Sequence, residues 1–360
     1  MIDVLHQDLG PSRRTRLIVF AAVGTLLLLF GLLGTSLTRE GSDALPAISR
    51  SGENQAWFCP LTVPSGRVAI QSTGASGSAD FVVATSDRST EASIGFGAGE
   101  LKTFGPSDLV AKAPAGSTVR VPRDGVVVSH AYNGTVAPVN CQNRAESRLV
   151  FTENTTSQGA STTLALFNPF FDPAVVDVSF NTDVGSIAPK NMQGIVVSPR
   201  SLKLIDTGAE VTRRSWITTI VTTRSGRIAA ETTQSSERLE VDRFIAGPAP
   251  LPRSSWFSPP SDPSAPGNDV LSLVNTSSAE VGVQVSVSAT GRQSIEPFEM
   301  RVPAEGRVIL DLRNEGRLPK DAPLEIRVDG QNGAQVIASR TLPGPVSMVG
   351  NQRWAYLQER

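Results

Sequence analysis

Short runs in which hydrophobic and polar residues alternate, or in which β-branched residues cluster, recur along most of the chain. Such runs predict β-strands, because successive side chains of a strand point to opposite faces of a sheet. Clusters of Gly, Pro, Asn and Asp separate them, and no window has the period of a long amphipathic helix. We expect strands at Asp80–Ser86, Ser117–Val121, Val175–Phe180, Trp216–Thr223, Val281–Val287 and Arg307–Leu312.

The strand pattern repeats three times. An aromatic residue opens each copy at a spacing of about 100 residues: Trp57 in AWFCP, Phe151 in LVFTEN and Trp256 in SWFSPP. Thr163–Phe180 and Val270–Val287 also match, since both segments show a strand, a turn led by Asn, and a second strand.

Two further landmarks recur in the same order. A proline stands shortly before a strand in each copy, and a tight-turn pair stands late in each copy, where it predicts a terminal hairpin. The prolines are Pro114, Pro199 and Pro303, and the turn pairs are Asn133-Gly134, Ser225-Gly226 and Asn332-Gly333.

Ordered landmarks of this kind indicate diverged copies of one domain, of the length usual for immunoglobulin-like and fibronectin-like β-sandwiches. We therefore expect an all-β chain of tandem sandwiches behind one transmembrane helix. The predicted parts are a cytoplasmic tail (1–16), a transmembrane anchor (17–37), a linker (38–54), three sandwich domains (55–144, 145–245 and 246–345) and a C-terminal tail (346–360).

The predicted anchor is Leu17–Leu37, a run without any charged residue. As a helix it would be about 31 Å long, close to the thickness of a bilayer's hydrocarbon core. Arg13, Arg14 and Arg16 precede it, so the positive-inside rule keeps the N-terminus in the cytoplasm and sends the rest out of the cell. The alternative is a cleaved signal peptide, but the apolar part of a signal peptide is usually shorter and no clear Ala-x-Ala site follows.

The chain has 2 cysteines, Cys59 and Cys141, at the two ends of the first copy. We expect a disulfide between them, because an exported domain folds in an oxidising compartment. In the chain-entropy model a loop of this size stabilises the fold by about 4–4.5 kcal/mol. Ser258 stands where the third copy would carry the equivalent of Cys59, and two separate buried thiols are the alternative.

The composition favours neither a cofactor nor a nucleic acid. The formal charge of -1 gives no reason to expect a polyanionic partner, and 2 His with 2 Cys make an all-protein metal site improbable. We find none of the common hydrolase, phosphate-loop or metalloprotease motifs. His130, the one histidine in the exported part, sits in a predicted strand without a nucleophile context, so we expect no catalytic residue, although paired carboxylates among the 34 acidic residues leave a glycosidase open.

The segment FNPFFDP offers the clearest candidate for binding. Phe170 and Phe171 are neighbours on an extended backbone and therefore face opposite ways, so both cannot enter one sandwich core. One of them fills a junction with a neighbouring copy or forms an exposed anchor for a partner or a sugar. Trp216 and Trp354 are weaker candidates, since we expect Trp57 and Trp256 in cores or junctions.

A membrane anchor, a WFCP opening and repeated β domains rich in Ala, Val, Thr, Ser and Arg resemble an actinobacterial family of anchored extracytoplasmic proteins of unknown function. The resemblance supports the topology and implies no chemistry. We expect a non-catalytic scaffold or interaction protein of the cell envelope, with an envelope protein or a glycan as partner. The alternatives are a module that binds cell-wall carbohydrate and an envelope hydrolase.

Overall fold

The computed structural model describes residues 55–74, 76–121, 125–131, 139–236, 244–260, 269–289, 291–292, 294–341 and 354–356. These residues belong to one compact unit, Ser51–Arg360. The predicted cytoplasmic tail, anchor and linker lie outside the described residues. In the described part of the chain, no helix is both long enough and apolar enough to cross a bilayer.

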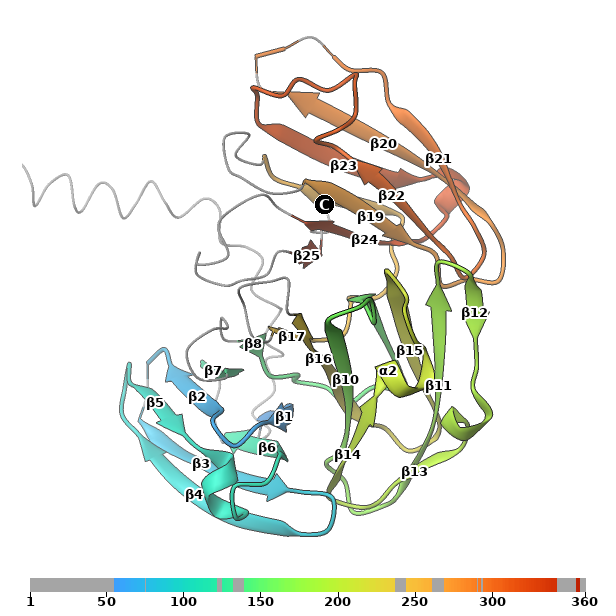
Figure 1. The fold of residues 1–360 in the computed structure, drawn as a ribbon. Coiled ribbons are helices and arrows are strands. Elements are labelled where there is room, and N and C mark those ends of the chain that lie inside the picture. The colour runs from blue at the N-terminus through green and yellow to red at the C-terminus, as the bar shows by residue number, and fades with distance from the viewer. Residues whose placement is uncertain are drawn as a thin grey trace, which may run out of the picture. The chain divides into compact units, whose positions relative to one another are not determined.

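The described chain is all-β and forms three consecutive pairs of antiparallel sheets, coloured blue to cyan, green to yellow and orange to red in Figure 1. All six predicted strands are confirmed, with shifts of a few residues at their ends. Each pair encloses its own cluster of buried hydrophobic side chains, contributed by both sheets. We call the pairs sandwich 1 (residues 55–141), sandwich 2 (148–246) and sandwich 3 (255–356).

Sandwich 1 packs its sheets around buried valines and phenylalanines, with Phe81 1% exposed at the centre. One sheet has the order β1-β6-β3-β4 and the other β5-β2-β7-β8. The strands are β1 Gln55–Thr62, β2 Arg67–Ser72, β3 Gly77–Ala84, β4 Ser89–Phe96, β5 Leu101–Phe104, β6 Ala115–Val121, β7 Val126–Ala131 and β8 Val139–Asn140, with a 3-10 turn at Pro106–Leu109.

Sandwich 2 has the sheet orders β12-β11-β15-β9, with β13 also pairing β11, and β14-β10-β16-β17. The strands are β9 Arg148–Asn154, β10 Ala160–Asn168, β11 Ala174–Thr182, β12 Gly185–Ile187, β13 Ile195–Val197, β14 Ser201–Asp206, β15 Ile217–Ser225, β16 Ala229–Ser236 and β17 Phe244–Ala246. Its one short helix is α2, Thr207–Glu210, and a 3-10 turn spans Lys190–Met192. The carboxylate of Asp206 caps α2 by accepting a hydrogen bond from the Gly208 N–H.

Sandwich 3 has the sheet orders β18-β23-β20-β21 and β22-β19-β24-β25. The strands are β18 Ser255–Ser258, β19 Val270–Val274, β20 Val281–Ala289, β21 Phe298–Val302, β22 Arg307–Asp311, β23 Leu324–Gly330, β24 Ile337–Thr341 and β25 Trp354–Tyr356, with a 3-10 turn at Gln331–Gly333. β25 lies within the predicted C-terminal tail (346–360), pairs with β24 and completes a sheet.

All three sandwiches have one strand order. Counted from the N-terminal strand, one sheet runs first, sixth, third, fourth and the other runs fifth, second, seventh, eighth, with β12 and β13 sharing the fourth place in sandwich 2. The pairs second–fifth and third–sixth also occur in immunoglobulin domains. The first strand here pairs with the sixth, however, whereas in an immunoglobulin constant domain it pairs with the second.

The aromatic landmarks occupy equivalent places. Trp57, Phe151 and Trp256 lie on the first strand of their sandwiches, β1, β9 and β18, and pack against the cores. The matched strand–Asn–strand segments are also equivalent. Asn168 is the last residue of β10 and Asn275 directly follows β19, and each donates a side-chain hydrogen bond to a backbone carbonyl across the following turn, at 2.8 Å and 2.7 Å.

The other two landmarks hold only in part. Pro199 and Pro303 precede the fifth strand of sandwiches 2 and 3, but Pro114 directly precedes β6, the sixth strand of sandwich 1. The predicted terminal hairpins at Ser225-Gly226 and Asn332-Gly333 are wrong, because each turn joins a sixth strand to a seventh strand that lies in the opposite sheet.

The positive backbone angles expected for these turns are present. Gly226 has φ 74° and Gly333 has φ 75°, conformations that favour glycine. Asn133-Gly134 lies outside the described residues, between β7 and β8. The counterpart in sandwich 1 is Gly125, which has φ 80° and directly precedes β7, the seventh strand.

Candidate functional site

The predicted disulfide is confirmed in sandwich 1. Cys59 on β1 and Cys141, directly after β8, are bonded with their Cα atoms 4.7 Å apart. Because β1 and β8 belong to opposite sheets, the bond ties the two layers together. Both cysteines are buried within the core of sandwich 1, so this site is structural.

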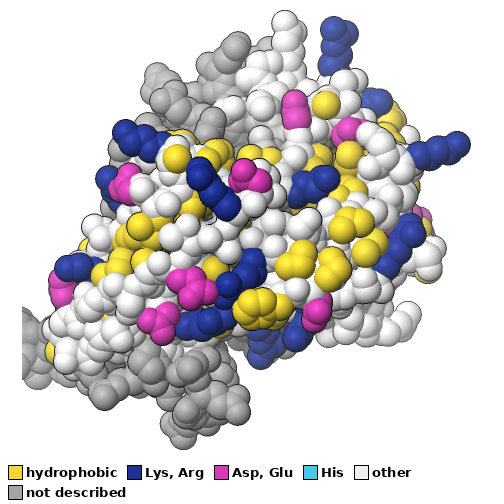
Figure 2. Space-filling model, turned by 90° about the horizontal axis from the view of Figure 1, so that it is seen from below, with side chains coloured by type: hydrophobic (Ala, Val, Ile, Leu, Met, Phe, Trp, Pro, Cys, Tyr) yellow, Lys and Arg dark blue, Asp and Glu magenta, His cyan; other side chains and the backbone are white. Residues whose placement is uncertain are grey.

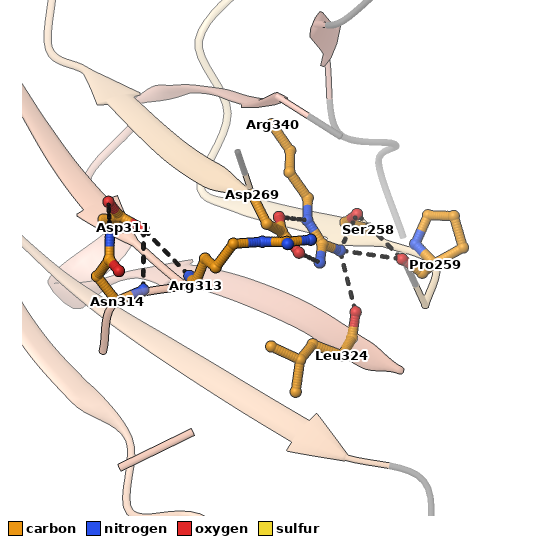
Figure 3. Close-up of polar contacts among 8 residues, drawn as sticks. All are labelled: Ser258, Pro259, Asp269, Asp311, Arg313, Asn314, Leu324 and Arg340. Atoms are coloured by element: carbon orange, nitrogen blue, oxygen red, sulfur yellow. Dashed lines mark hydrogen bonds and ion pairs between the residues drawn. The ribbon is translucent and has the colours of Figure 1, made fainter. Parts of the chain in front are cut away.

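Sandwich 3 holds a buried charged cluster in the corresponding region, drawn in Figure 3. Both Nε and Nη2 of Arg340 donate to the carboxylate of Asp269 at 2.8 Å. Nη1 of Arg340 donates to Ser258 Oγ at 3.0 Å and to the carbonyls of Pro259 and Leu324. The Arg340 side chain is fully buried, so these contacts satisfy a charge that would otherwise be costly inside a core.

Sandwiches 1 and 2 meet through an apolar junction. Phe58 on β1 and Phe167 on β10 lie in one buried cluster, and the ring of Phe167 approaches the backbone of Gly116 so closely that an added Cβ would lie 2.4 Å from it. The remaining buried members are Leu61, Ala84, Ala145, Ala165, Leu202 and Ala229. Across the same junction, the Leu202 N–H donates to the Thr85 carbonyl at 2.9 Å.

Phe170 and Phe171 take different roles at the rim of this junction. Phe170 packs on the apolar cluster, with its ring centroid 6.2 Å from that of Phe58. Phe171 is 70% exposed, and the Arg200 guanidinium lies 4.2 Å from its ring centroid. Arg200 also pairs with Glu91 of β4 at 2.8 Å, so it links sandwich 2 to sandwich 1 beside the exposed ring.

A buried acid–base pair crosses the same junction. His130 on β7 and Glu231 on β16 place Nε2 and Oε2 3.1 Å apart, with side chains 1% and 2% exposed. The other imidazole nitrogen, Nδ1, lies 3.0 Å from the carbonyl oxygen of Leu61 on β1. Sandwich 1 therefore contributes the imidazole and sandwich 2 the carboxylate.

The surroundings shift both protonation equilibria in the same direction. Burial disfavours the imidazolium, but the Glu231 carboxylate and the Leu61 carbonyl outweigh that effect and raise the pKa of His130 above its ordinary value of 6.5. Burial also raises the pKa of Glu231 above 4.5, against the opposing effects of His130 and the Leu61 backbone. The pair therefore retains protons that the separate groups would release.

A groove of about 150 Å³ opens between the two sandwiches. Two cross-strand pairs of hydroxyl side chains line it, Ser161 opposite Ser235 and Thr163 opposite Thr233 on β10 and β16. Its other lining residues are Leu61, Val63, Pro114 and Leu204. The groove thus combines hydroxyl donors and acceptors with an apolar wall.

Sandwiches 2 and 3 are also joined by a buried pair. Glu153 on β9 accepts from Arg307 on β22 at 3.0 Å and from the Ser339 hydroxyl on β24 at 2.5 Å. The two charged side chains are 7% and 8% exposed. Trp216, a binding candidate from the sequence, lies here, with the Arg307 guanidinium 5.2 Å from its ring centroid.

A small apolar cluster accompanies this second pair. Val150 and Ile220 of sandwich 2 pack with Val274 and Ile337 of sandwich 3, and Ala249 of the connecting segment packs on them. The Ala249 N–H donates to the Val150 carbonyl at 2.7 Å. The segment that connects sandwich 2 to sandwich 3 is thus also hydrogen-bonded to a strand of sandwich 2.

The candidate residues do not assemble into a recognisable catalytic centre. The ring nitrogens of His130 contact the Leu61 carbonyl and the Glu231 carboxylate, and neither of these is a hydroxyl or thiol nucleophile. In the part of the chain that the structure describes, no three His, Cys, Asp or Glu side chains are grouped so as to hold a metal ion. Trp354 lies on β25, and its side chain is outside the described part of the structure.

Part of the chain is similar to a known protein family. Residues 125–253 are similar to a family of unknown function, DUF5719. The matched segment begins at the start of β7 and ends after β17, so it contains all of sandwich 2 and both members of the His130–Glu231 pair. The expected similarity to a family of unknown function is confirmed for this segment. No curated protein matches the chain.

Sequence reasoning missed the acidic partners at both junctions. Glu231 and Glu153 lie within ordinary strand sequences, and no motif marks them. One signal was available for Glu231. Alternation along β16 places Glu231 on the outer face of its sheet, together with Ala229 and Thr233. Both neighbours are small or semipolar, which indicates that another part of the protein covers this face.

Proposed function

We propose that this protein is a non-catalytic, membrane-anchored scaffold of the cell envelope that holds three sandwiches in fixed mutual orientations. The observation that carries the proposal is the construction of the two junctions. Each combines a buried apolar cluster with a buried acid–base pair contributed by two different sandwiches.

Such junctions favour rigid spacing over flexible tethering. A buried charge is costly unless its partner is held at hydrogen-bonding distance. If a junction slid or rotated, the two partners would separate and leave an unpaired buried charge, so such motion is unfavourable. The segment Ala246–Ser255 between sandwiches 2 and 3 contains three prolines, which restrict its backbone further. Fixed orientation is what a spacer between the membrane and a partner needs.

The sequence supports the rest of the proposal. The uncharged Leu17–Leu37 segment and its arginine flank favour a single-pass anchor with the sandwiches outside the cell. The shared strand order supports an origin of the sandwiches as diverged copies of one immunoglobulin-like unit in which the first and fourth strands join the sheet of the third and sixth, and the seventh joins the sheet of the second and fifth. The resemblance to anchored actinobacterial proteins agrees with this placement.

The surface agrees with a protein partner better than with a polyanion. On the face shown in Figure 2, charged side chains of both signs lie among hydrophobic ones, without a field of one sign. Phe171 is an exposed aromatic ring beside a paired arginine, a combination that is frequent in protein interfaces. We propose it as a contact point for an envelope protein.

Two measurements, one on spheroplasts and one on membranes, test the proposal. Protease added to spheroplasts should digest the chain after Thr38 and leave a tag placed before Arg13 intact, whereas protection of the C-terminal part would contradict the topology. Cross-linking in membranes should recover one envelope protein with the wild-type chain and less of it with Phe171→Ser. Equal recovery with the variant would remove Phe171 from the proposed contact.

The groove between sandwiches 1 and 2 favours a second candidate, recognition of a cell-wall glycan. Its hydroxyl ladder and apolar wall suit the polar edge and apolar face of a sugar ring. Titration of purified wall fragments into the full chain, with Thr163→Val as the matched variant, distinguishes the two. Saturable binding that the variant loses would support glycan recognition by the groove. Absence of binding would leave the scaffold role as the proposed function.

A further inference from the structure

We propose that the junction between sandwiches 1 and 2 closes with the uptake of one proton, held between His130 and Glu231, so that mild acid tightens the junction and alkali loosens it. The proposal concerns the junction itself and depends neither on the membrane anchor nor on the partner. It would make the orientation of the two sandwiches sensitive to the pH of their surroundings.

The geometry alone requires the proton. A carbonyl oxygen can only accept, so the Nδ1 atom of His130, 3.0 Å from the Leu61 oxygen, carries a hydrogen. In a neutral imidazole the other nitrogen, Nε2, is then an acceptor. It lies 3.1 Å from Oε2 of Glu231, which is also an acceptor when ionised. Two acceptors at this distance repel, so one additional proton lies between them.

Among the described residues, no other charge competes for this proton. The imidazole on β7 meets an uncharged carbonyl from β1 and the carboxylate from β16. Glu231 is the one group whose charge acts on His130 among the described residues, and His130 is the one whose charge acts on Glu231. Because both side chains are buried, loss of the proton leaves an unpaired carboxylate inside the junction.

The sign of the effect follows from proton counting. When the junction opens, water reaches both groups, and near neutral pH they become a neutral imidazole and a carboxylate. The closed junction binds more protons than the open one above the ordinary histidine value of 6.5, so its stability falls as pH rises through the raised pKa of His130. The raised pKa of Glu231 acts in the same direction.

Hydrogen exchange of the full chain in nanodiscs, followed by mass spectrometry between pH 5.5 and 9, tests the proposal. The Leu202 N–H reports on the junction because it donates to Thr85 across it. After correction for intrinsic base catalysis, the protection of the peptide containing Leu202 should fall by up to about tenfold per pH unit above the ordinary histidine value. Protection of β20 in sandwich 3 should stay constant over the same range.

Two variants separate this effect from a general loss of stability. Glu231→Gln has nearly the same shape and no titrating carboxylate, so above the ordinary histidine pKa of 6.5 its Leu202 protection should not fall as pH rises, whether the junction stays closed or stands open. Glu153→Gln, at the other junction, should keep the wild-type dependence. Protection of wild-type Leu202 that is independent of pH would overturn the proposal, as would a Glu231→Gln variant with the wild-type dependence.

Discussion

His130 of sandwich 1 and Arg340 of sandwich 3 occupy the same position of the seventh strand. His130 pairs with Val68 and Arg340 pairs with Leu271, and each of these partners is the second residue of the second strand of its sandwich. Both basic side chains are buried and bond to a carbonyl next to the first strand or at its end. They differ in where the acid comes from.

In sandwich 3 the acid is internal, since Asp269 stands two residues before Leu271. In sandwich 1 the equivalent residue is Gly66, two residues before Val68, which has no side chain to offer. His130 instead meets Glu231 from sandwich 2. In sandwich 3 the basic residue at this position therefore stabilises its own core. In sandwich 1 the basic residue at the same position joins sandwich 1 to sandwich 2.

Removal of the Asp269 charge should therefore destabilise sandwich 3. Asp269→Asn removes the carboxylate charge that Nε and Nη2 of Arg340 contact inside the core, which we expect to cost about 3–5 kcal/mol of unfolding free energy. Guanidinium unfolding followed by tryptophan fluorescence measures it, because Trp256 is in the same core. The double variant Arg340→Met with Asp269→Leu should recover most of the loss. A cost below about 1 kcal/mol for Asp269→Asn would show that Arg340 and Asp269 do not form a buried ion pair.

The disulfide should stabilise sandwich 1 specifically. Replacement of Cys59 and Cys141 by Ser should lower its unfolding free energy by about 2–5 kcal/mol, because the open chain gains conformational freedom when unfolded. Exchange protection of sandwich 3 should be unchanged, and that sandwich serves as the internal control. Peptide mapping of the wild type without reduction should recover the linked pair, and alkylation of both thiols in the native protein would refute it.

Phe170 and Phe171 form a matched pair of positions for a test of the first junction. Phe170→Ser removes a partly buried ring from the cluster with Phe58 and should cost about 1–3 kcal/mol, less than a fully buried ring. Phe171→Ser removes an exposed ring and should change stability by less than about 1 kcal/mol. Chemical unfolding of both variants checks this. Equal costs would contradict the placement of the two rings.

The second junction should depend on Arg307. Arg307→Met leaves Glu153 buried with only the Ser339 hydroxyl to satisfy it, and it removes the cation beside Trp216. We expect a loss of about 3–5 kcal/mol in the free energy of the junction, read as faster exchange of the Ala249 N–H. Arg301→Met, which removes an exposed arginine of the same sandwich, is the control and should have no effect.

Much of this fold could be predicted from local patterns. Alternation predicted the strands, and the aromatic openings at Trp57, Phe151 and Trp256 gave the copies, because each of these features is fixed by packing within one sandwich. The spacing of Cys59 and Cys141 predicted the disulfide for the same reason.

What the sequence hid is non-local. A glycine turn such as Ser225-Gly226 is the same signal whether the chain turns within a sheet or passes to the other sheet, so the predicted hairpins were wrong. Glu231 and Glu153 are ordinary strand residues until another sandwich covers them. Partners that come from another copy leave no periodic mark in the sequence.

The central claim is that buried junctions fix the orientation of the sandwiches, and distances between spin labels test it most directly. Labels on cysteines introduced at Leu101, Val184 and Ile309 use exposed sites in sandwiches 1, 2 and 3, and the native cysteines are bonded to each other. Each pair of labels should give one narrow distance distribution in the otherwise unaltered chain, and Arg307→Met should broaden only the distributions that cross the second junction. Broad distributions without any substitution would contradict the account.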